Sequence, residues 1–162
     1  MPSAQPTPTR KRVIMRKQAK KPDASIGSNW ATIRQNTVML TGVDKHKLIQ
    51  KGLSTRILRD AIGTYHFVTE GQLLHAIGLS SKTLGRRLDE HLGPRHSDAA
   101  MALIEITDMA QRVLGKRELA EAWLDHPAIA LDGQKPLDML SSAPGIESVK
   151  DLLTRLEYGV YA

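Results

Sequence analysis

Histidine and cysteine are the residue types that most often build metal sites, and neither is arranged for one in this sequence. The six histidines include no pair at positions i and i+4 with a glutamate between them, the spacing of a helical zinc site. His91 and His96 are five residues apart with Pro94 between them, so one helix face would not carry both. The absence of cysteine excludes thiolate ligands and disulfides. We therefore expect no metal ion.

Residue types used in covalent and acid–base catalysis are present but are not combined. Ser141 and Ser142 have no obvious base, and Asp132 and Asp138 fit turn and helix-capping positions better than an acid–base pair. The glycines do not form a phosphate-binding loop. The sequence therefore predicts a protein that is not an enzyme and that carries no cofactor.

Basic residues cluster on a predicted helix in the middle of the chain. Thr69 and Gln72 form a capping box for one helix, Gly78 opens a tight turn, and a second helix follows over residues 82–90. This is the helix-turn-helix pattern, in which the second helix enters the DNA major groove. The residues predicted to contact DNA are Lys82, Thr83, Arg86 and Arg87.

The alternative is that these two helices only pack together and that the charges are simply solvated. Gly85 weakens the case for base recognition, because a glycine inside a helix costs about 1 kcal/mol relative to alanine and offers no side chain. A close approach by a neighbouring backbone would explain the glycine.

Short helices with clear ends precede this pair, and a long one follows it. Asp44 can cap a helix that Gly52 closes, and Ser54 can cap another that Gly63 closes. Pro94 ends the helix that carries the basic cluster.

A long amphipathic helix is expected from Ser97-Asp98 to Gly115. It would join the two halves of the chain and could supply a dimer face. Its apolar stripe consists of Ala99, Leu103, Ile106, Ala110 and Val113.

The last third of the chain opens with a helix over 116–124, in which Trp123 fits the core better than a contact surface. Pro127 and Pro136 suit first helical positions, so two one-turn helices would flank the Asp132-Gly133 turn. Short helices broken by glycine and proline are a plausible recognition surface.

The final helix follows the breaker Pro144-Gly145, and Gly159 should end it. Val160-Tyr161-Ala162 would then be a short tail with a free carboxylate, and Tyr161 would either contact a partner or fold back onto its own domain. The apolar stripe of this helix consists of Ile146, Val149, Leu153, Leu156 and Val160, with Leu152 beside it.

Composition indicates a soluble, all-α protein. Apolar residues make up 41% of the sequence, charged residues 25% and aromatic residues only 4%, which favours a helical core of aliphatic side chains. The sequence has no apolar run long enough for a membrane span, and its basic start lacks the apolar stretch of a secretory signal. We therefore expect a cytoplasmic protein.

The charged residues are distributed unevenly along the chain, whose net charge is +6. Residues 1–51 hold eleven lysines and arginines against two acidic residues, whereas residues 99–162 hold six against ten. This pattern favours a polyanion partner at the front and a different partner at the back. We expect a flexible basic arm and lead-in over 1–43, a helix-turn-helix domain over 44–98 and a second helical domain over 99–162, with the mobile, lysine-rich segment 1–28 either solvated or touching nucleic acid.

The last third resembles the toxin-binding domain of Xre/MbcA/ParS-type antitoxins, the antitoxin half of RES–Xre toxin–antitoxin pairs. The resemblance covers about a third of the chain closely and the middle third more loosely, at Leu79-Ser80, Lys82-Thr83-Leu84 and Arg86-Arg87-Leu88. The residues that carry it are Val113-Leu114-Gly115, Ala122-Trp123-Leu124, Pro127-Ala128, Ala130-Leu131-Asp132-Gly133, Pro136-Leu137-Asp138-Met139-Leu140, Gly145, Val149, Leu152-Leu153, Arg155, Glu157 and Gly159-Val160-Tyr161-Ala162.

The resemblance implies an antitoxin that silences a RES-domain toxin by covering its active site with the last helix and tail. It also implies binding to double-stranded operator DNA, as a homodimer, to repress its own operon. The toxins of this family degrade NAD or transfer ADP-ribose from it, and that chemistry would belong to the partner. The implied toxin-binding residues are Val149, Leu152, Leu153, Arg155, Leu156, Glu157, Gly159, Val160, Tyr161 and Ala162.

Two other classes remain open from the sequence. One is a stand-alone helix-turn-helix repressor whose C-terminal domain only dimerises. The other is an interaction scaffold that never touches DNA, which a salt-dependent affinity for duplex would exclude.

Overall fold

The computed structural model describes residues 40–86 and 90–159. Regular structure in these two ranges is helical, and the strand-like pairings within them are isolated bridges, between Ser54 and His91 and between Ala128 and Gln134. The predicted all-α fold is confirmed. The basic arm 1–28 and the candidate residues Arg87, Val160, Tyr161 and Ala162 lie outside the described ranges.

The helices follow one another with short connections. In chain order they are α2 (Gly42–Lys51), α3 (Thr55–Ile62), α4 (Glu70–Ala76), α5 (Ser81–Arg86), α6 (Pro94–Leu114), α7 (Arg117–Leu124), the 3-10 turn η1 (Ile129–Leu131), α8 (Pro136–Met139) and α9 (Ala143–Glu157).

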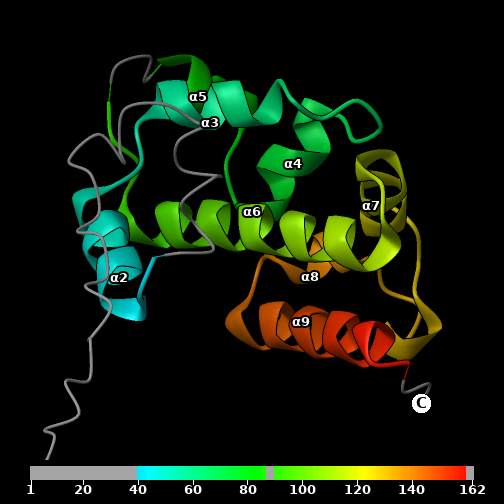
Figure 1. Cartoon of the computed structure of the whole chain (residues 1–162). Helices are drawn as coiled ribbons and strands as arrows, with labels where there is room; N and C mark the ends of the chain where they lie inside the picture. Colours follow the sequence, from blue (N-terminus) through cyan, green and yellow to red (C-terminus); the bar gives the residue numbers. More distant parts are fainter. Residues whose placement is uncertain (1–39, 87–89, 160–162) are drawn as a thin grey trace, which may run out of the picture.

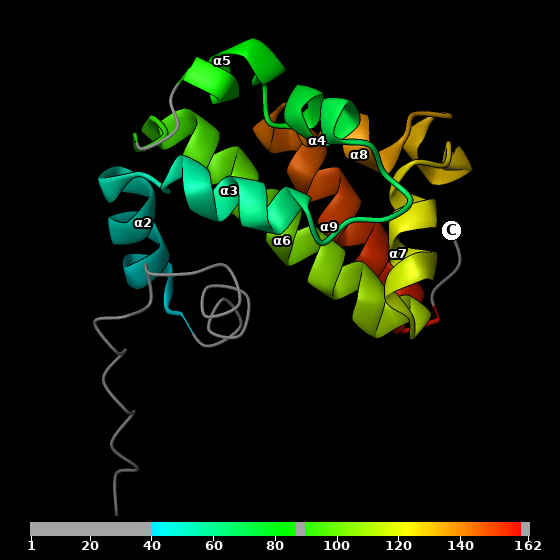
Figure 2. The same cartoon turned by 90° about the horizontal axis from the view of Figure 1, so that it is seen from above.

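Helix α6 is the axis of the molecule. Figure 1 shows α3, α4 and α5 on one side of it and α8 and α9 on the other, with α2 beside its beginning and α7 beside its end. Figure 2, seen from above, confirms that α5 and the C-terminal end of α9 lie at opposite corners. Two outward surfaces are therefore carried by one central helix.

The capping pattern of the sequence fixes several helix ends as predicted. The Ser54 side chain caps α3, and Thr69 and Gln72 form the complete capping box of α4. Gly115 takes the left-handed conformation, with φ 83°, that ends α6. These ends depend on local hydrogen bonds, which is why the sequence specifies them.

Several predicted helix starts are wrong, including those of α2, α6 and η1. Thr41, not Asp44, is the N-cap of α2, and its hydroxyl oxygen accepts from the Asp44 backbone N–H at 3.2 Å. Pro94 begins α6 instead of only ending the preceding helix, because a proline at the first helical position sacrifices no hydrogen bond. Pro127 precedes η1 by two residues and does not start it, whereas Pro136 starts α8 as expected.

Ser97 lies inside α6 and is fully buried, which the sequence did not suggest. Its hydroxyl oxygen accepts from the Leu53 N–H at 3.0 Å and donates to the Leu92 carbonyl at 3.3 Å. Ser97, which was expected at the start of the helix, therefore links α6 to the segment before α3 and to the segment after α5.

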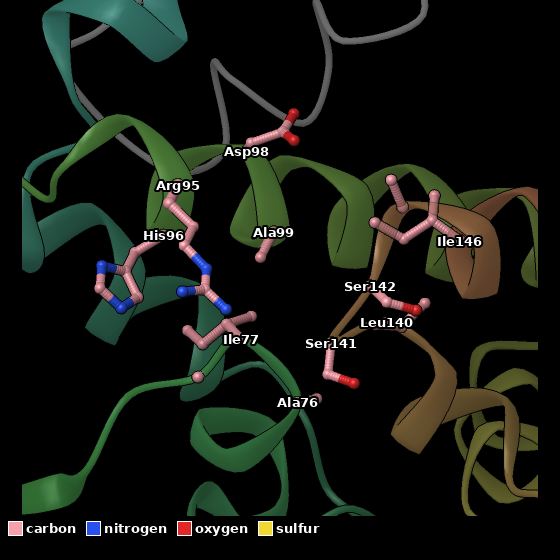
Figure 3. Close-up of a pocket in the computed structure, with 12 residues that line it drawn as sticks. Ala76, Ile77, Arg95, His96, Asp98, Ala99, Leu140, Ser141, Ser142 and Ile146 are labelled. Atoms are coloured by element: carbon pink, nitrogen blue, oxygen red, sulfur yellow. The ribbon is translucent and has the colours of Figure 1, made fainter.

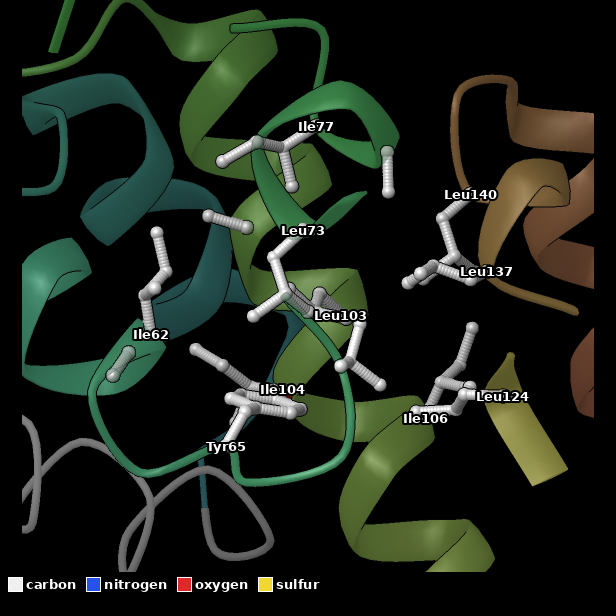
Figure 4. Close-up of a cluster of buried hydrophobic side chains, with 14 of the residues drawn as sticks. Ile62, Tyr65, Leu73, Ile77, Leu103, Ile104, Ile106, Leu124, Leu137 and Leu140 are labelled. Atoms are coloured by element: carbon white, nitrogen blue, oxygen red, sulfur yellow. The ribbon is translucent and has the colours of Figure 1, made fainter. Parts of the chain in front are cut away.

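One continuous hydrophobic core surrounds α6 (Figure 4). Leu103, Ile106 and Ala110 of the predicted α6 stripe are packed inside the chain itself, so this stripe is not a free dimer face. The core continues without a break across the expected domain boundary at residue 98, within α6. Its fully buried large side chains include Leu73, Leu74, Ile106, Leu124, Leu137, Leu140, Val149 and Leu153.

Candidate functional site

Helix α9 is anchored at its beginning by close backbone packing. The Ser142 hydroxyl oxygen accepts from the Gly145 N–H at 3.2 Å, which starts the helix three residues earlier than the sequence suggested. A Cβ at position 145 would collide with the Met139 carbonyl, so a glycine is required where α9 crosses the end of α8. This contact sets the direction in which α9 leaves the core.

The predicted toxin-binding residues on α9 fall into two groups. Val149 and Leu153 are completely buried and Leu152 is 8% exposed, so these three hold the helix in the core. Leu156 is half-buried against the same core. Among the predicted toxin-binding residues that the structure describes, only Glu157 and Gly159 are exposed.

The end of α9 is open to solvent. Glu157 and Gly159 are exposed, and the Tyr158 side chain is 75% exposed. Gly159 has φ +66°, the left-handed conformation expected at this helix terminus. The aromatic anchor that the structure describes is therefore Tyr158, which the sequence prediction passed over in favour of Tyr161.

Arg155 has an unsatisfied donor. Its Nε is buried and has no hydrogen-bond partner among the described residues. A buried unsatisfied donor costs about 1–3 kcal/mol, and an acceptor on a partner would recover that energy once the Arg155 side chain turns outward.

Ile129 is a site candidate that the sequence interpretation missed. It is 97% exposed in η1, and η1 packs against α9. Its neighbour Leu131 is buried, so the 3-10 turn points one aliphatic side chain into the core and one into solvent. Asp132, in the left-handed conformation with φ 53°, and Gly133 close the turn. The turn signal was visible in the sequence, but the direction of Ile129 was not.

A buried carboxylate links α7 to the loop before α4. The backbone N–H groups of His66 and Phe67 donate to Glu121 Oε2 at 2.8 and 2.9 Å, and Arg117 Nε donates to Oε1 at 2.8 Å. Burial by itself would raise the pKa of Glu121, but these hydrogen bonds outweigh burial and hold the pKa below its ordinary value of 4.5. Glu121 is 0% exposed and stays ionised.

Tyr65 strengthens the same junction. Its ring lies 4.4 Å from the Arg117 guanidinium carbon, and its hydroxyl is 2.8 Å from that of Thr107 on α6. Burial raises the pKa of Tyr65, so the phenol stays neutral. The loop that leads into α4 is thus held against both α6 and α7.

Two further polar links join the two sides of α6. Gln72 Nε2 and Lys135 Nζ donate to Asp125 Oδ1 at 2.7 and 2.9 Å, which connects α4 to the segment before α8. The hydrogen bond from Lys135 is the main cause of the lowered pKa of Asp125.

The second link runs from α2 through α6 to α9. Lys45 and Lys150 contact the Glu105 carboxylate at 2.6 and 3.1 Å. Burial would raise the pKa of Glu105, but the hydrogen bonds from the two lysines hold it below its ordinary value.

The candidate DNA-contacting residues lie on α5. Lys82 and Arg86 are exposed, whereas Thr83 is half-buried and its hydroxyl lies 2.8 Å from that of Ser80, which caps the helix. Leu84 is buried and anchors α5 in the core. Within the described part of the chain, a Cβ at Gly85 would meet nothing within 4 Å, so the expected close backbone approach is absent.

No group of histidine, aspartate and glutamate that could hold a metal ion occurs in residues 40–86 and 90–159. Among the helices of these ranges, none is long and apolar enough to cross a membrane. The side chains that stand out are instead suited to contacts with macromolecules.

Comparison with known proteins agrees with this geometry. Residues 109–159 match the family model of the antitoxin Xre/MbcA/ParS C-terminal toxin-binding domain. The match begins in the last two turns of α6 and continues through α9, and it includes Glu121, Ile129, Arg155 and Tyr158.

Curated relatives extend the similarity beyond this domain. An "Antitoxin Xre" of Yersinia enterocolitica is 28% identical over 117 residues, covering 70% of this chain and 78% of the relative. An "Antitoxin Xre" of Pseudomonas putida is 28% identical over 115 residues, covering 70% of this chain and 62% of the relative. A "Prs ADP-ribosylating antitoxin" of a Sphingobium species is 23% identical over 131 residues, covering 74% and 82%.

These matches support an antitoxin of a toxin–antitoxin system. The predicted resemblance to Xre/MbcA/ParS-type antitoxins is confirmed.

Proposed function

We propose that this antitoxin neutralises a RES-domain toxin by covering the toxin's active site with the end of α9 and the residues after it. The observation that carries the proposal is the exposure of two large apolar side chains, Ile129 at 97% and Tyr158 at 75%, on elements that contact each other. Exposed anchors of this kind, together with an arginine, are the usual carriers of interface energy.

The contact would combine burial of apolar surface with satisfaction of Arg155. An acceptor on the toxin, such as a carboxylate or a backbone carbonyl, would pair with the Nε that has no partner among the described residues. Val149 and Leu153 would act indirectly, by holding α9 rigid while its end is engaged. The name of the Sphingobium relative refers to ADP-ribosylation, which is chemistry of the kind expected from RES-domain toxins.

Removal of Val160–Ala162 tests the blocking mechanism. Cells that co-express the RES-domain toxin with the shortened antitoxin should lose protection, whereas the circular dichroism and melting temperature of the antitoxin should stay the same. Full rescue by the shortened protein would contradict the mechanism. Failure of the intact chain to co-purify with any RES-domain toxin would contradict the choice of partner.

We also propose that α5 binds operator DNA, with two copies of the chain presenting two copies of the helix to adjacent half-sites. Lys82 and Arg86 support this proposal because both are exposed on a short helix whose buried side is anchored by Leu84. The expected setting is the cytoplasm, where operator and toxin are both accessible.

Replacement of Arg86 and Arg87 by alanine should abolish operator retention in a gel shift. Arg112→Ala is a matched control, because Arg112 is exposed on α6 rather than on α5. Retention of operator by the double variant would rule out α5 as the DNA-contacting helix. A chain that binds DNA but captures no toxin would instead be a stand-alone repressor.

A further inference from the structure

A cavity of about 330 Å³ lies away from the end of α9, between the end of α4, the beginning of α6 and the α8–α9 junction. Figure 3 shows that its walls come from both sides of α6. Its apolar lining includes Ala76, Ile77, Ala99, Leu140 and Ile146, and its polar lining includes Arg95, His96, Asp98, Ser141 and Ser142.

Arg95 is the side chain that gives this cavity its chemistry. Its guanidinium lies above Ile77 and faces the segment that carries Ser141, while the Asp98 carboxylate points away (Figure 3). Within 40–86 and 90–159, the side chains of Arg95 and His96 form no hydrogen bond and no ion pair. Arg95 is exposed at the mouth of this cavity, so its guanidinium is hydrated and no described side chain pairs with it.

The position of the Arg95 charge is unfavourable for the helix itself. Arg95 and His96 lie in the first turn of the 21-residue helix α6, which contains no acidic residue there and has no side-chain cap. A cation at a helix N-terminus opposes the helix dipole at a cost of about 0.3–1 kcal/mol. Local rules broken without internal compensation are expected at functional sites, and an anion in the cavity would supply the compensation.

The size and remaining lining of the cavity narrow the class of ligand. Its volume falls near the lower end of the roughly 300–1,000 Å³ typical of ligand sites, so an inorganic anion would leave most of it empty. Ile77 and Leu140 offer apolar surface to the rest of a ligand. Ser141 donates to the Asp138 carbonyl at 3.0 Å, whereas the Ser142 oxygen only accepts, from Gly145, so its proton is available to a ligand.

We propose that this cavity binds a small organic anion, a phosphate or carboxylate attached to an apolar or ring-shaped body. Arg95 binds the anionic group, the Ser142 hydroxyl donates to it, and Ile77 and Leu140 contact the body of the ligand. Because the walls come from α4 and from the α8–α9 junction, the bound ligand stabilises the packing of both against α6. The proposal is independent of the identity of the toxin and of DNA binding.

Isothermal titration of the full chain tests the proposal with adenosine monophosphate as the probe, because it joins a phosphate to a ring. Adenosine and inorganic phosphate, which each carry one half of the probe, are the comparison ligands. Saturable binding of the monophosphate is expected, with at least tenfold weaker binding of either half. Arg95→Ala should lower the affinity for adenosine monophosphate at least tenfold, whereas Arg112→Ala on the same helix should leave the affinity unchanged.

A second variant tests the contribution of the cavity to binding separately from that of the Arg95 charge. Ala99→Leu fills the cavity from α6 and keeps Arg95, so it should also weaken binding while melting cooperatively. Equal binding by the native chain and Arg95→Ala, adenosine binding as tightly as the monophosphate, or absence of saturation would overturn the proposal. A loss of duplex affinity in Arg95→Ala without any loss of monophosphate binding would also overturn it, and would assign Arg95 to a DNA phosphate.

Discussion

Helix α5 and the η1–α9 pair are the two outward surfaces of the molecule, and they differ in chemistry. The exposed side chains proposed for function on α5 are the cations Lys82 and Arg86. On η1 and α9 they are the apolar Ile129 and Tyr158. Charged side chains suit a hydrated polyanion, whereas exposed aliphatic and aromatic side chains suit a partner that removes water. The proposed functions therefore assign a different class of partner to each surface.

Their separation is as informative as their composition. Figures 1 and 2 place α5 and the end of α9 at opposite corners, so two partners would not compete for space on one copy of the chain. The two sides nevertheless share α6 and are joined by Glu121, Asp125 and Glu105. We therefore expect that a substitution on one surface can abolish binding there alone, whereas loss of one of these links destabilises both sides together.

Glu121→Ala should have the largest effect, because it breaks the junction between the two sides. Loss of one member of a buried ion pair costs about 3–5 kcal/mol. The variant should therefore unfold at much lower denaturant concentration and lose toxin binding and DNA binding together. Glu118→Ala, an exposed glutamate on the same helix, is the control. Equal denaturation midpoints for the two variants would show that the sides are not coupled through Glu121.

Ile129→Asp should act on one surface alone. Placing a carboxylate in a dehydrated protein interface should weaken toxin binding by at least about 30-fold, equivalent to about 2 kcal/mol. Stability should change little, because Ile129 is 97% exposed. Leu119→Asp, at a 52%-exposed leucine of α7, is the matched control for an acidic substitution elsewhere. Surface plasmon resonance on the toxin distinguishes them, and equal affinities would exclude Ile129 from the interface.

The double change Lys82→Ala and Arg86→Ala should act on the opposite surface. If each cation neutralises one phosphate, the slope of log affinity against log salt should fall by roughly two, and affinity for operator should drop about 10- to 100-fold. Toxin binding should be unchanged. Fluorescence anisotropy over a salt series measures both quantities, and an unchanged slope would contradict phosphate contact by α5.

Low pH should lower the stability of the protein, because it protonates Glu121, which joins α7 to the loop before α4. The pKa of Glu121 is held below its unfolded value of 4.5, so the stability it contributes is present above pH 4.5 and is lost as pH falls through the lowered pKa. Glu105 contributes with the same sign. Melting temperature against pH should therefore fall below pH 4.5, and the fall should be shallower in Glu121→Gln. Parallel curves for the two proteins would contradict this assignment.

Gly85→Ala should have the smallest effect and should be stabilising. Gly85 lies inside α5, is exposed and has open space around its Cβ position. Alanine is favoured over glycine in a helix by about 0.5–1 kcal/mol. Thermal melting should show the gain, and operator affinity should stay within twofold. A loss of DNA affinity would reveal that the DNA backbone approaches α5 at this glycine.

The sequence by itself determined the helical class and most helix ends, including the caps at Ser54 and Thr69 and the stops at Gly115 and Gly159. These features depend on hydrogen bonds and backbone conformations within a few residues, which residue type and spacing specify directly. Motif order in the last third also identified the antitoxin family, which the comparisons confirm.

Only the tertiary structure decided which side chains are available. The apolar spacing of α9 did not distinguish Val149 and Leu153, which are completely buried, from residues that can meet a partner, and it gave no reason to single out Ile129. The sequence did not single out Glu121, whose backbone partners at His66 and Phe67 lie more than fifty residues away. Burial and long-range pairing depend on how separate helices pack around α6, and no local pattern encodes that arrangement.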